Sequence, residues 1–101
     1  DATPGGSPEY TAYSEAYKKE YGEEMDAWAA WNYDALMILA KAIHEVGPDR
    51  NKVREAILNL RDYRGVLGIY SFSPNGDGRH SACVVEVNKG QPVLKKVVTV
   101  D

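Results

Sequence analysis

The sequence predicts a small α+β domain in which three helices are followed by about three strands. Apolar residues recur at helical spacing through the first sixty positions, whereas the chain from Gly65 onward is rich in β-branched residues and turn signals. The strongest periodicity lies between Glu24 and Gly47, where apolar residues follow one another at steps of three and four. We therefore expect this stretch to be the central helix around which the other elements pack.

The central helix is predicted to run for about six turns and to have two well-marked ends. Asp26 is a suitable N-cap, and Gly47 followed by Pro48 marks the other end, because proline cannot continue a helix. The expected apolar stripe comprises Trp28, Trp31, Ala35, Ile38, Leu39, Ala42, Ile43 and Val46. Leu36, Met37 and Ala40 widen this stripe, so the residues expected to face water are Asn32, Asp34, Lys41, His44 and Glu45.

Two shorter helices are expected on either side of the central one. Ser7 and Pro8 are typical of a helix start, and Gly22 is typical of a helix end. Four tyrosines recur at steps of three and four in this first helix: Tyr10, Tyr13, Tyr17 and Tyr21. Such a stripe could stack on sugars or bases, but packing against the domain is the favoured interpretation. The third helix is expected from about Arg50 to Leu60 and is capped by Asp49.

The strands are expected in the last third of the chain. The run VLGIYSF after Gly65 predicts one or two short strands, and residues 73–78 form a dense turn signal. The runs ACVVEV and PVLKKVVTV predict a hairpin that is connected by Asn88 to Gln91.

This order of elements leaves a problem of burial. A helix that is apolar on most sides needs neighbours on two of them, and about three strands are too few to cover it. Exposure of both tryptophans would cost several kcal/mol at about 25 cal/mol per Å² of apolar area, which approaches the net stability of a domain. We therefore expect Trp28 and Trp31 to be uncovered by their own chain. The complementary surface would come from missing upstream sequence or from a second copy of the chain.

Composition and motifs exclude several classes of function. The net charge of −3 and the lack of a basic cluster argue against nucleic acid as a partner. The single cysteine, Cys83, cannot form an internal disulfide and is interpreted as a small buried hydrophobe. The turn at residues 75–78 does not meet the EF-hand pattern, and His44 and His80 have no partner at ligand spacing. We expect no metal, no cofactor and no enzymatic activity, since glycine-rich phosphate loops and nucleophile motifs are missing too.

The start of the central helix is the one candidate binding site. Unpaired N–H groups and the positive end of the helix dipole meet there, next to Trp28 and Trp31. An apolar wall beside backbone donors suits an amino acid or another carboxylate ligand. The alternative is that both indoles belong to the core and that Asp26 already satisfies the helix end.

Four segments, taken in order, resemble the C-terminal part of periplasmic binding proteins of the branched-chain amino acid type. They are residues 12–22, 26–35, 52–57 and 72–80, and they include the helix motif Tyr33-Asp34-Ala35 and a turn similar to FDPNGD. Ser73 stands where that family often has aspartate, and Trp31-Asn32 replaces a common small pair. The resemblance covers nearly the whole chain.

The resemblance implies a type I solute-binding fold with two α/β lobes around a hinge, of which residues 1–101 would be the C-terminal fragment. Residues 1–72 would supply first-lobe helices and a strand, residues 73–81 the turn and last crossover, and residues 82–101 a second-lobe hairpin. The start of the helix would face the cleft between the lobes. The positions carried over as ligand-binding are Asp26, Ala27, Trp28, Ala30 and Trp31.

The function implied by the resemblance is that of an extracytoplasmic component of an ABC importer, which binds amino acids or related carboxylate-bearing solutes. Its partners would be the solute, a membrane permease and the missing N-terminal part or a second copy of the chain. The location would be periplasmic or extracytoplasmic, with a lipid anchor as an option. Because the loops that hold the ligand lie upstream in such proteins, this chain alone is expected to bind poorly. Two alternatives stay open: an interaction domain that dimerises through its apolar helix, and the sensory domain of a receptor.

Overall fold

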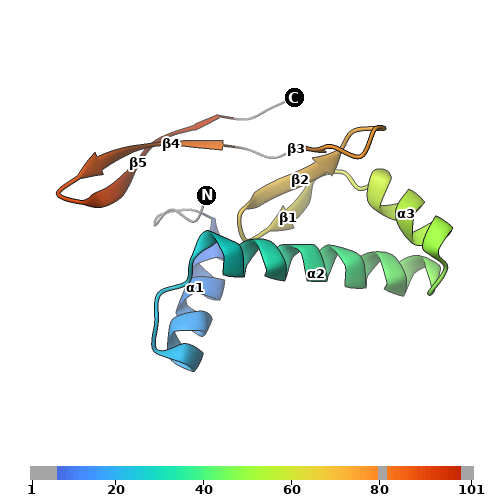
Figure 1. The fold of residues 1–101 in the computed structure, drawn as a ribbon, viewed down its shortest axis with the longest axis horizontal. Helices are drawn as coiled ribbons and strands as arrows, with labels where there is room; N and C mark the ends of the chain where they lie inside the picture. Colours follow the sequence, from blue (N-terminus) through green and yellow to red (C-terminus); the bar gives the residue numbers. More distant parts are fainter. Residues whose placement is uncertain (1–6, 80–81, 99–101) are drawn as a thin grey trace.

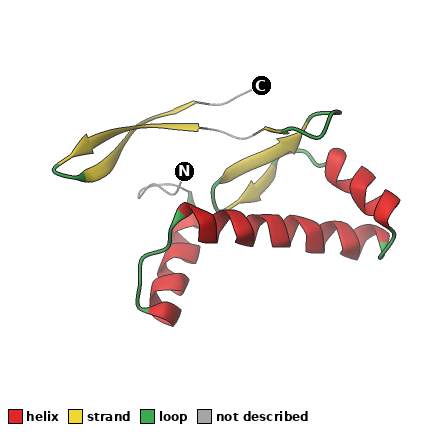
Figure 2. Cartoon of the chain, in the orientation of Figure 1, coloured by secondary structure: helices red, strands yellow, loops and turns green. Residues whose placement is uncertain are grey.

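The computed structural model describes residues 7–79 and 82–98, which form three helices and five strands (Figure 1). The α+β prediction is confirmed, although the described strands outnumber the expected three. The helices are α1 (Pro8–Tyr21), α2 (Ala27–Val46) and α3 (Arg50–Leu58). The strands are β1 (Tyr63–Gly65), β2 (Gly68–Phe72), β3 (Gly78–Arg79), β4 (Ala82–Asn88) and β5 (Gln91–Val98). Helices and strands gather on different sides of the molecule (Figure 2).

The helix starts are capped by the residues that the sequence predicts. The side chains of Ser7, Asp26 and Asp49 accept hydrogen bonds from backbone N–H groups three residues later, at 3.2, 2.8 and 3.0 Å. Gly22 and Gly47 end α1 and α2 with φ of +70° and +82°, a region that glycine adopts without steric cost.

Helix α3 ends at Leu58, two residues before the predicted end. The N–H of Asn59 still donates to the carbonyl oxygen of Glu55 at 2.9 Å, as in an α-helix. The N–H of Leu60 instead donates to the carbonyl oxygen of Ile57 at 3.0 Å, three residues earlier. Apolar spacing continues through this closing turn, which is why the pattern alone extends the helix too far.

The first hairpin starts earlier in the chain than the sequence predicts. β1 begins at Tyr63 and pairs antiparallel with β2, with Tyr63 opposite Tyr70 and Gly65 opposite Gly68. Val66 and Leu67 therefore form the turn and are not part of a strand. β3 adds two residues to the other edge of β2, with Phe72 opposite Gly78. A long-range contact explains the difference, because the N–H groups of Val66 and Leu67 donate to the carboxylate of Asp34 on α2.

The second hairpin is confirmed. β4 and β5 pair antiparallel from Ala82 and Val98 to Asn88 and Gln91, with an irregularity between Val84 and Val85. The connection contains only Lys89 and Gly90, both at positive φ (+50° and +77°), as in the tight turns that join twisted strands. This hairpin lies apart from the helices and from β1–β3 (Figure 1).

The core is small and lies where α1, α2 and the β1–β2 turn meet. It consists of Tyr10, Ala30 and Val66, against which Tyr13, Met25 and Leu67 pack. The buried row of α2 runs at four-residue spacing and comprises Ala30, Asp34, Ile38 and Ala42. The predicted stripe is thus correct at Ile38 and Ala42 and wrong for most of its other members.

Much of the apolar surface of α2 outside this buried row is uncovered. Trp28 is 69% exposed and Leu36 is 64% exposed, and Trp31, Leu39 and Ile43 are each 41% exposed. We refer to these five residues as the outer face of α2. The expectation that both indoles are uncovered by their own chain is confirmed, because the neighbours of α2, which are α1, α3 and the β1–β2 turn, bury only one row of the helix.

Candidate ligand-binding site at the start of the central helix

Trp28 and Trp31 form an aromatic corner at the start of α2. Their ring centroids are 5.2 Å apart and the ring planes meet at 85°, an edge-to-face arrangement. Because the two residues are three positions apart, they lie on neighbouring parts of the same helix surface. One indole therefore offers a face and the other an edge to anything that binds there.

Backbone donors lie directly beside this corner. The carboxylate of Asp26 accepts from the N–H of Ala29, but the N–H groups of Ala27 and Trp28 have no acceptor within the described part of the chain. These groups carry the positive end of the helix dipole, which favours a negatively charged partner. The side-chain amide of Asn32 donates to the carbonyl oxygen of Trp28 at 2.8 Å. The corner can thus combine apolar contact with hydrogen bonds to an anion.

The five predicted site residues do not all reach this surface. Asp26, Trp28 and Trp31 are exposed and Ala27 is half-buried. Ala30 is 0% exposed and packs in the core beside Tyr10 and Val66, so its side chain is not available to a ligand in this structure.

Helix α1 holds the start of α2 in place. The hydroxyl of Tyr13 donates to the carbonyl oxygen of Ala29 at 3.4 Å, and its ring lies 4.6 Å from that of Tyr33. Lys18 forms an ion pair with Glu24 at 2.5 Å across the connection between the helices. Tyr10 is buried, whereas Tyr21 at the far end of α1 is 66% exposed. The tyrosine stripe therefore packs against the domain at its first half only.

Asp34 is a structural polar residue whose position differs from the one that the sequence predicts. It was expected to face water, yet it is 1% exposed. Its carboxylate accepts hydrogen bonds from the N–H of Val66 at 2.7 Å, the N–H of Leu67 at 3.0 Å and the hydroxyl of Tyr70 at 2.8 Å. The available signal was its position inside an apolar helix, where a carboxylate needs partners.

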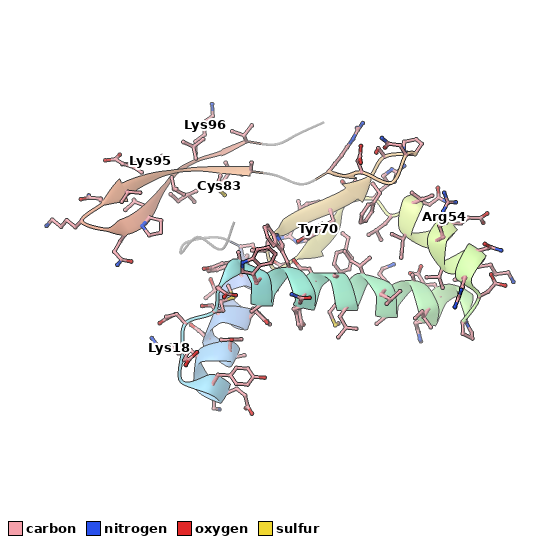
Figure 3. The ribbon with its side chains drawn as sticks, viewed as in Figure 1. Lys18, Arg54, Tyr70, Cys83, Lys95 and Lys96 are labelled. Atoms are coloured by element: carbon pink, nitrogen blue, oxygen red, sulfur yellow. The ribbon has the colours of Figure 1, made fainter. Side chains whose placement is uncertain are left out.

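These contacts join the β1–β2 hairpin to the middle of α2. Tyr70 lies on β2 and points toward α2 (Figure 3). Burial raises the pKa of Tyr70, and the hydrogen bond to Asp34 and the charge of that carboxylate raise it further. A Cβ on Gly65 would come within 2.7 Å of both Asp34 and Tyr70, so only glycine fits this close approach. The network positions the hairpin and has no open surface for a ligand.

The other candidate features of the sequence concern metal ligands, the cysteine and membrane spans. Within residues 7–79 and 82–98, no group of three or more His, Cys, Asp or Glu side chains could hold a metal ion. His80 lies outside the described residues. Cys83 is a half-buried free thiol on β4 (Figure 3). Among the described helices, none is both long and apolar enough to cross a membrane.

Comparison with known proteins gives one family and several similar folds. The sequence model of the family described as periplasmic binding protein matches residues 2–92. A leucine-binding protein from Thermotoga maritima is 34% identical, with a TM-score of 0.81 over 98% of this chain. A putative branched-chain amino acid ABC transporter from Rhodospirillum rubrum is 27% identical, with a TM-score of 0.79 over 91% of this chain.

A third structure is similar in fold alone. It is the solute-binding protein of an ABC transporter from R. palustris in complex with benzoate, which is 18% identical with a TM-score of 0.79 over 98% of this chain. The chain spans 29%, 28% and 29% of the lengths of these three proteins. Comparison with curated protein sequences gives no match.

Proposed function

This chain belongs to the periplasmic binding protein family, and we propose that it is the C-terminal part of the solute-binding component of an ABC importer for amino acids or related small carboxylates. The resemblance noted in the sequence is confirmed. The prediction that the chain is not an enzyme is confirmed too, because the family comprises binding components of transport systems. Family membership also implies an extracytoplasmic location, whereas a lipid anchor belongs to the proposal.

The observation that supports the proposal most strongly is the aromatic corner beside the free amides of α2. A solute carboxylate would accept hydrogen bonds from the N–H groups of Ala27 and Trp28, which have no acceptor in the described part. The apolar part of the solute would pack against Trp28 and Trp31, which are 69% and 41% exposed. Asp26 lies at the same helix end and could accept from the solute's ammonium group.

The proposed lobe boundaries follow the separation of the two hairpins. Residues 1–72 would belong to the first lobe, residues 73–81 to the turn and crossover, and residues 82–101 to the second lobe. The position of the β4–β5 hairpin, apart from α1–α3 and β1–β3, supports this division (Figure 1). The solute would bind in the cleft between the lobes, and a membrane permease would receive it.

A thermal-shift panel on the full-length protein tests the solute class. Amino acids and related carboxylates should raise the melting temperature in a concentration-dependent way, since a ligand that binds only the folded state stabilises it. A panel in which sugars or nucleotides raise the melting temperature and carboxylates do not would contradict the proposal.

A pair of variants then tests the site. Trp28→Ala should weaken solute binding by about tenfold or more in isothermal titration calorimetry, because it removes an aromatic contact. Leu36→Ala is the matched control, since Leu36 is similarly exposed at 64% but lies two turns further along α2. Equal affinities for the wild type and the Trp28 variant would rule out the aromatic corner as the solute site.

One further function is favoured by a specific observation, namely the uncovered outer face of α2. An interaction domain that dimerises through this face would bury Trp28, Leu36, Leu39 and Ile43 against a second copy. It would bind no small solute in the panel above. A stable dimer that ignores every solute would favour this function over solute binding.

A further inference from the structure

A hollow surface lies near the other end of α2, between α3 and the turn after β2. Its floor is apolar, and basic and polar residues form its rim. The lining residues are Arg50, Val53, Arg54, Ile57, Leu58, Phe72, Asn75 and Gly76, and we refer to them as the α3 groove. The groove has a volume of about 500 Å³, which is within the usual range of binding sites. Helix α3 lies beside the C-terminal end of α2 (Figure 1), whereas the aromatic corner is at the start of α2.

Both walls of the α3 groove are held by hydrogen bonds. The turn is closed by the N–H of Ser73, which donates to the carbonyl oxygen of Asp77, and by the N–H of Gly76, which donates to that of Ser73, both at 2.9 Å. The side-chain amide of Asn75 also donates to the carboxylate of Asp77 at 2.7 Å. The other wall is α3, whose first turn is capped by Asp49. A preformed groove of this kind loses little freedom when a partner binds.

The two arginines of the rim form no ion pair within the described part of the chain. Arg50 and Arg54 are exposed, and they lie one helical turn apart on the same side of α3. Four other basic side chains, namely Lys18, Lys41, Arg64 and Lys95, pair with Glu24, Glu45, Glu9 and Glu86. Other lysines such as Lys52 form no ion pair among the described residues either, but Lys52 does not line the groove. The groove thus carries local positive charge on a chain whose net charge is −3.

We propose that the α3 groove docks an acidic segment of a partner protein. Two carboxylates of that segment, about one helical turn apart, would pair with Arg50 and Arg54, whose planar guanidinium groups bind carboxylates in a bidentate way. An apolar side chain between the carboxylates would enter the floor formed by Val53, Ile57 and Phe72.

The surroundings favour this occupant over others. The residues that line the groove are half-buried or exposed, so the groove is open along its length and suits a peptide segment more than an enclosed solute. Nucleic acid is disfavoured because the groove offers only two arginines and the chain is acidic overall.

Fluorescence anisotropy with labelled peptides tests the proposal on the full chain, whose fold is verified by circular dichroism. The probe is a helical peptide of about ten residues with glutamates four positions apart and leucines between them. The control peptide has glutamine in place of each glutamate. The acidic peptide should bind with saturation and at least about tenfold more tightly than the control, and added salt should weaken its binding.

Charge-reversal variants locate the binding. Arg50→Glu combined with Arg54→Glu should weaken binding of the acidic peptide by about tenfold or more, because both pairs become repulsive. Lys52→Glu is the control, because it makes the same charge change on α3 outside the groove and should weaken binding by less than about threefold.

Three results would overturn the proposal. They are equal binding of the acidic and glutamine peptides, equal effects of the control and arginine variants, and no binding at all. None of these results bears on solute binding at the aromatic corner, so the two proposals fail independently.

Discussion

The carboxylate of Asp34 accepts three hydrogen bonds from residues 32 to 36 positions later in the chain. Each donor would otherwise be a polar group held near apolar surroundings without a partner. The carboxylate is 1% exposed, so the hydrogen bonds must offset the cost of removing its charge from water. The polar part of the contact between α2 and the β1–β2 hairpin is therefore concentrated on one side chain.

Removal of that side chain should destabilise the fold strongly. Asp34→Ala leaves the N–H groups of Val66 and Leu67 and the hydroxyl of Tyr70 without acceptors, and we expect it to lower the free energy of unfolding by about 3 kcal/mol or more. Urea denaturation measures this change. Glu45→Ala on the same helix removes only an exposed ion pair with Lys41 and should cost less than about 0.5 kcal/mol. An equal decrease in the free energy of unfolding for both variants would show that the Asp34 network stabilises the fold no more than an exposed ion pair does.

The raised pKa of Tyr70 predicts a loss of stability at alkaline pH. Unfolded tyrosine ionises near pH 10, whereas the folded state keeps the proton on Tyr70 to higher pH. Above about pH 10 the unfolded state therefore binds fewer protons than the folded state, and the free energy of unfolding falls as pH rises. Tyr70→Phe should flatten this fall in melts between pH 9 and pH 12. An unchanged slope in the Tyr70 variant would contradict this assignment.

Among the features of single residues, local ones could be predicted from the sequence and long-range ones could not. Cap residues such as Asp26 act on amides three positions away, so their role is visible in the local pattern. The partners of Asp34 lie more than thirty residues away, and hydrophobic spacing shows nothing of them. The same limit hides Gly65, whose importance comes from the approach of α2 and not from its own φ.

At the scale of elements, α2 shows what periodicity can and cannot predict. Its limits, Ala27 and Val46, follow from the cap at Asp26 and the glycine at position 47. Its buried row does not follow, because apolar residues occupy most of the helix circumference. The neighbouring elements bury Ala30, Ile38 and Ala42 and leave the tryptophans exposed. The predicted site shows the same limit. The start of α2 is where the sequence predicts it, but the side chain of Ala30 points into the core.

Two adjacent residues of α2 test which row faces the core. Ile38 is 6% exposed and Leu39 is 41% exposed. In this chain Ile38→Ala should cost about 2–4 kcal/mol in urea denaturation, whereas Leu39→Ala should cost less than about 1.5 kcal/mol. A larger cost at Leu39 than at Ile38 would show that the opposite row is buried.

At the scale of the whole molecule, the outer face of α2 is the main unexplained surface. Its exposed side chains include Trp28, Leu36 and Leu39, and several large apolar side chains exposed on one helix are typical of an interface. The β4–β5 hairpin likewise exposes valines such as Val84 and Val87. We infer that both surfaces are covered in the protein at work, either by further sequence of the same protein or by a second copy.

This exposure predicts that the chain by itself self-associates. Analytical ultracentrifugation should give a mass above that of an 11.2 kDa monomer, increasing with concentration. Leu36→Glu combined with Leu39→Glu should shift the mass toward the monomer, because charges on the outer face repel a second copy. A monomeric wild-type chain with a cooperative melt would show that these surfaces need no cover.

Tryptophan fluorescence of the full-length protein tests the central claim that the start of α2 contacts the solute. An amino acid that binds in calorimetry should change the emission with a saturable dependence on concentration, because Trp28 passes from water to contact with the ligand. Comparison with Trp28→Phe isolates the contribution of this residue. The account predicts that most of the change disappears in the variant, whereas an identical change in both proteins would place the solute elsewhere.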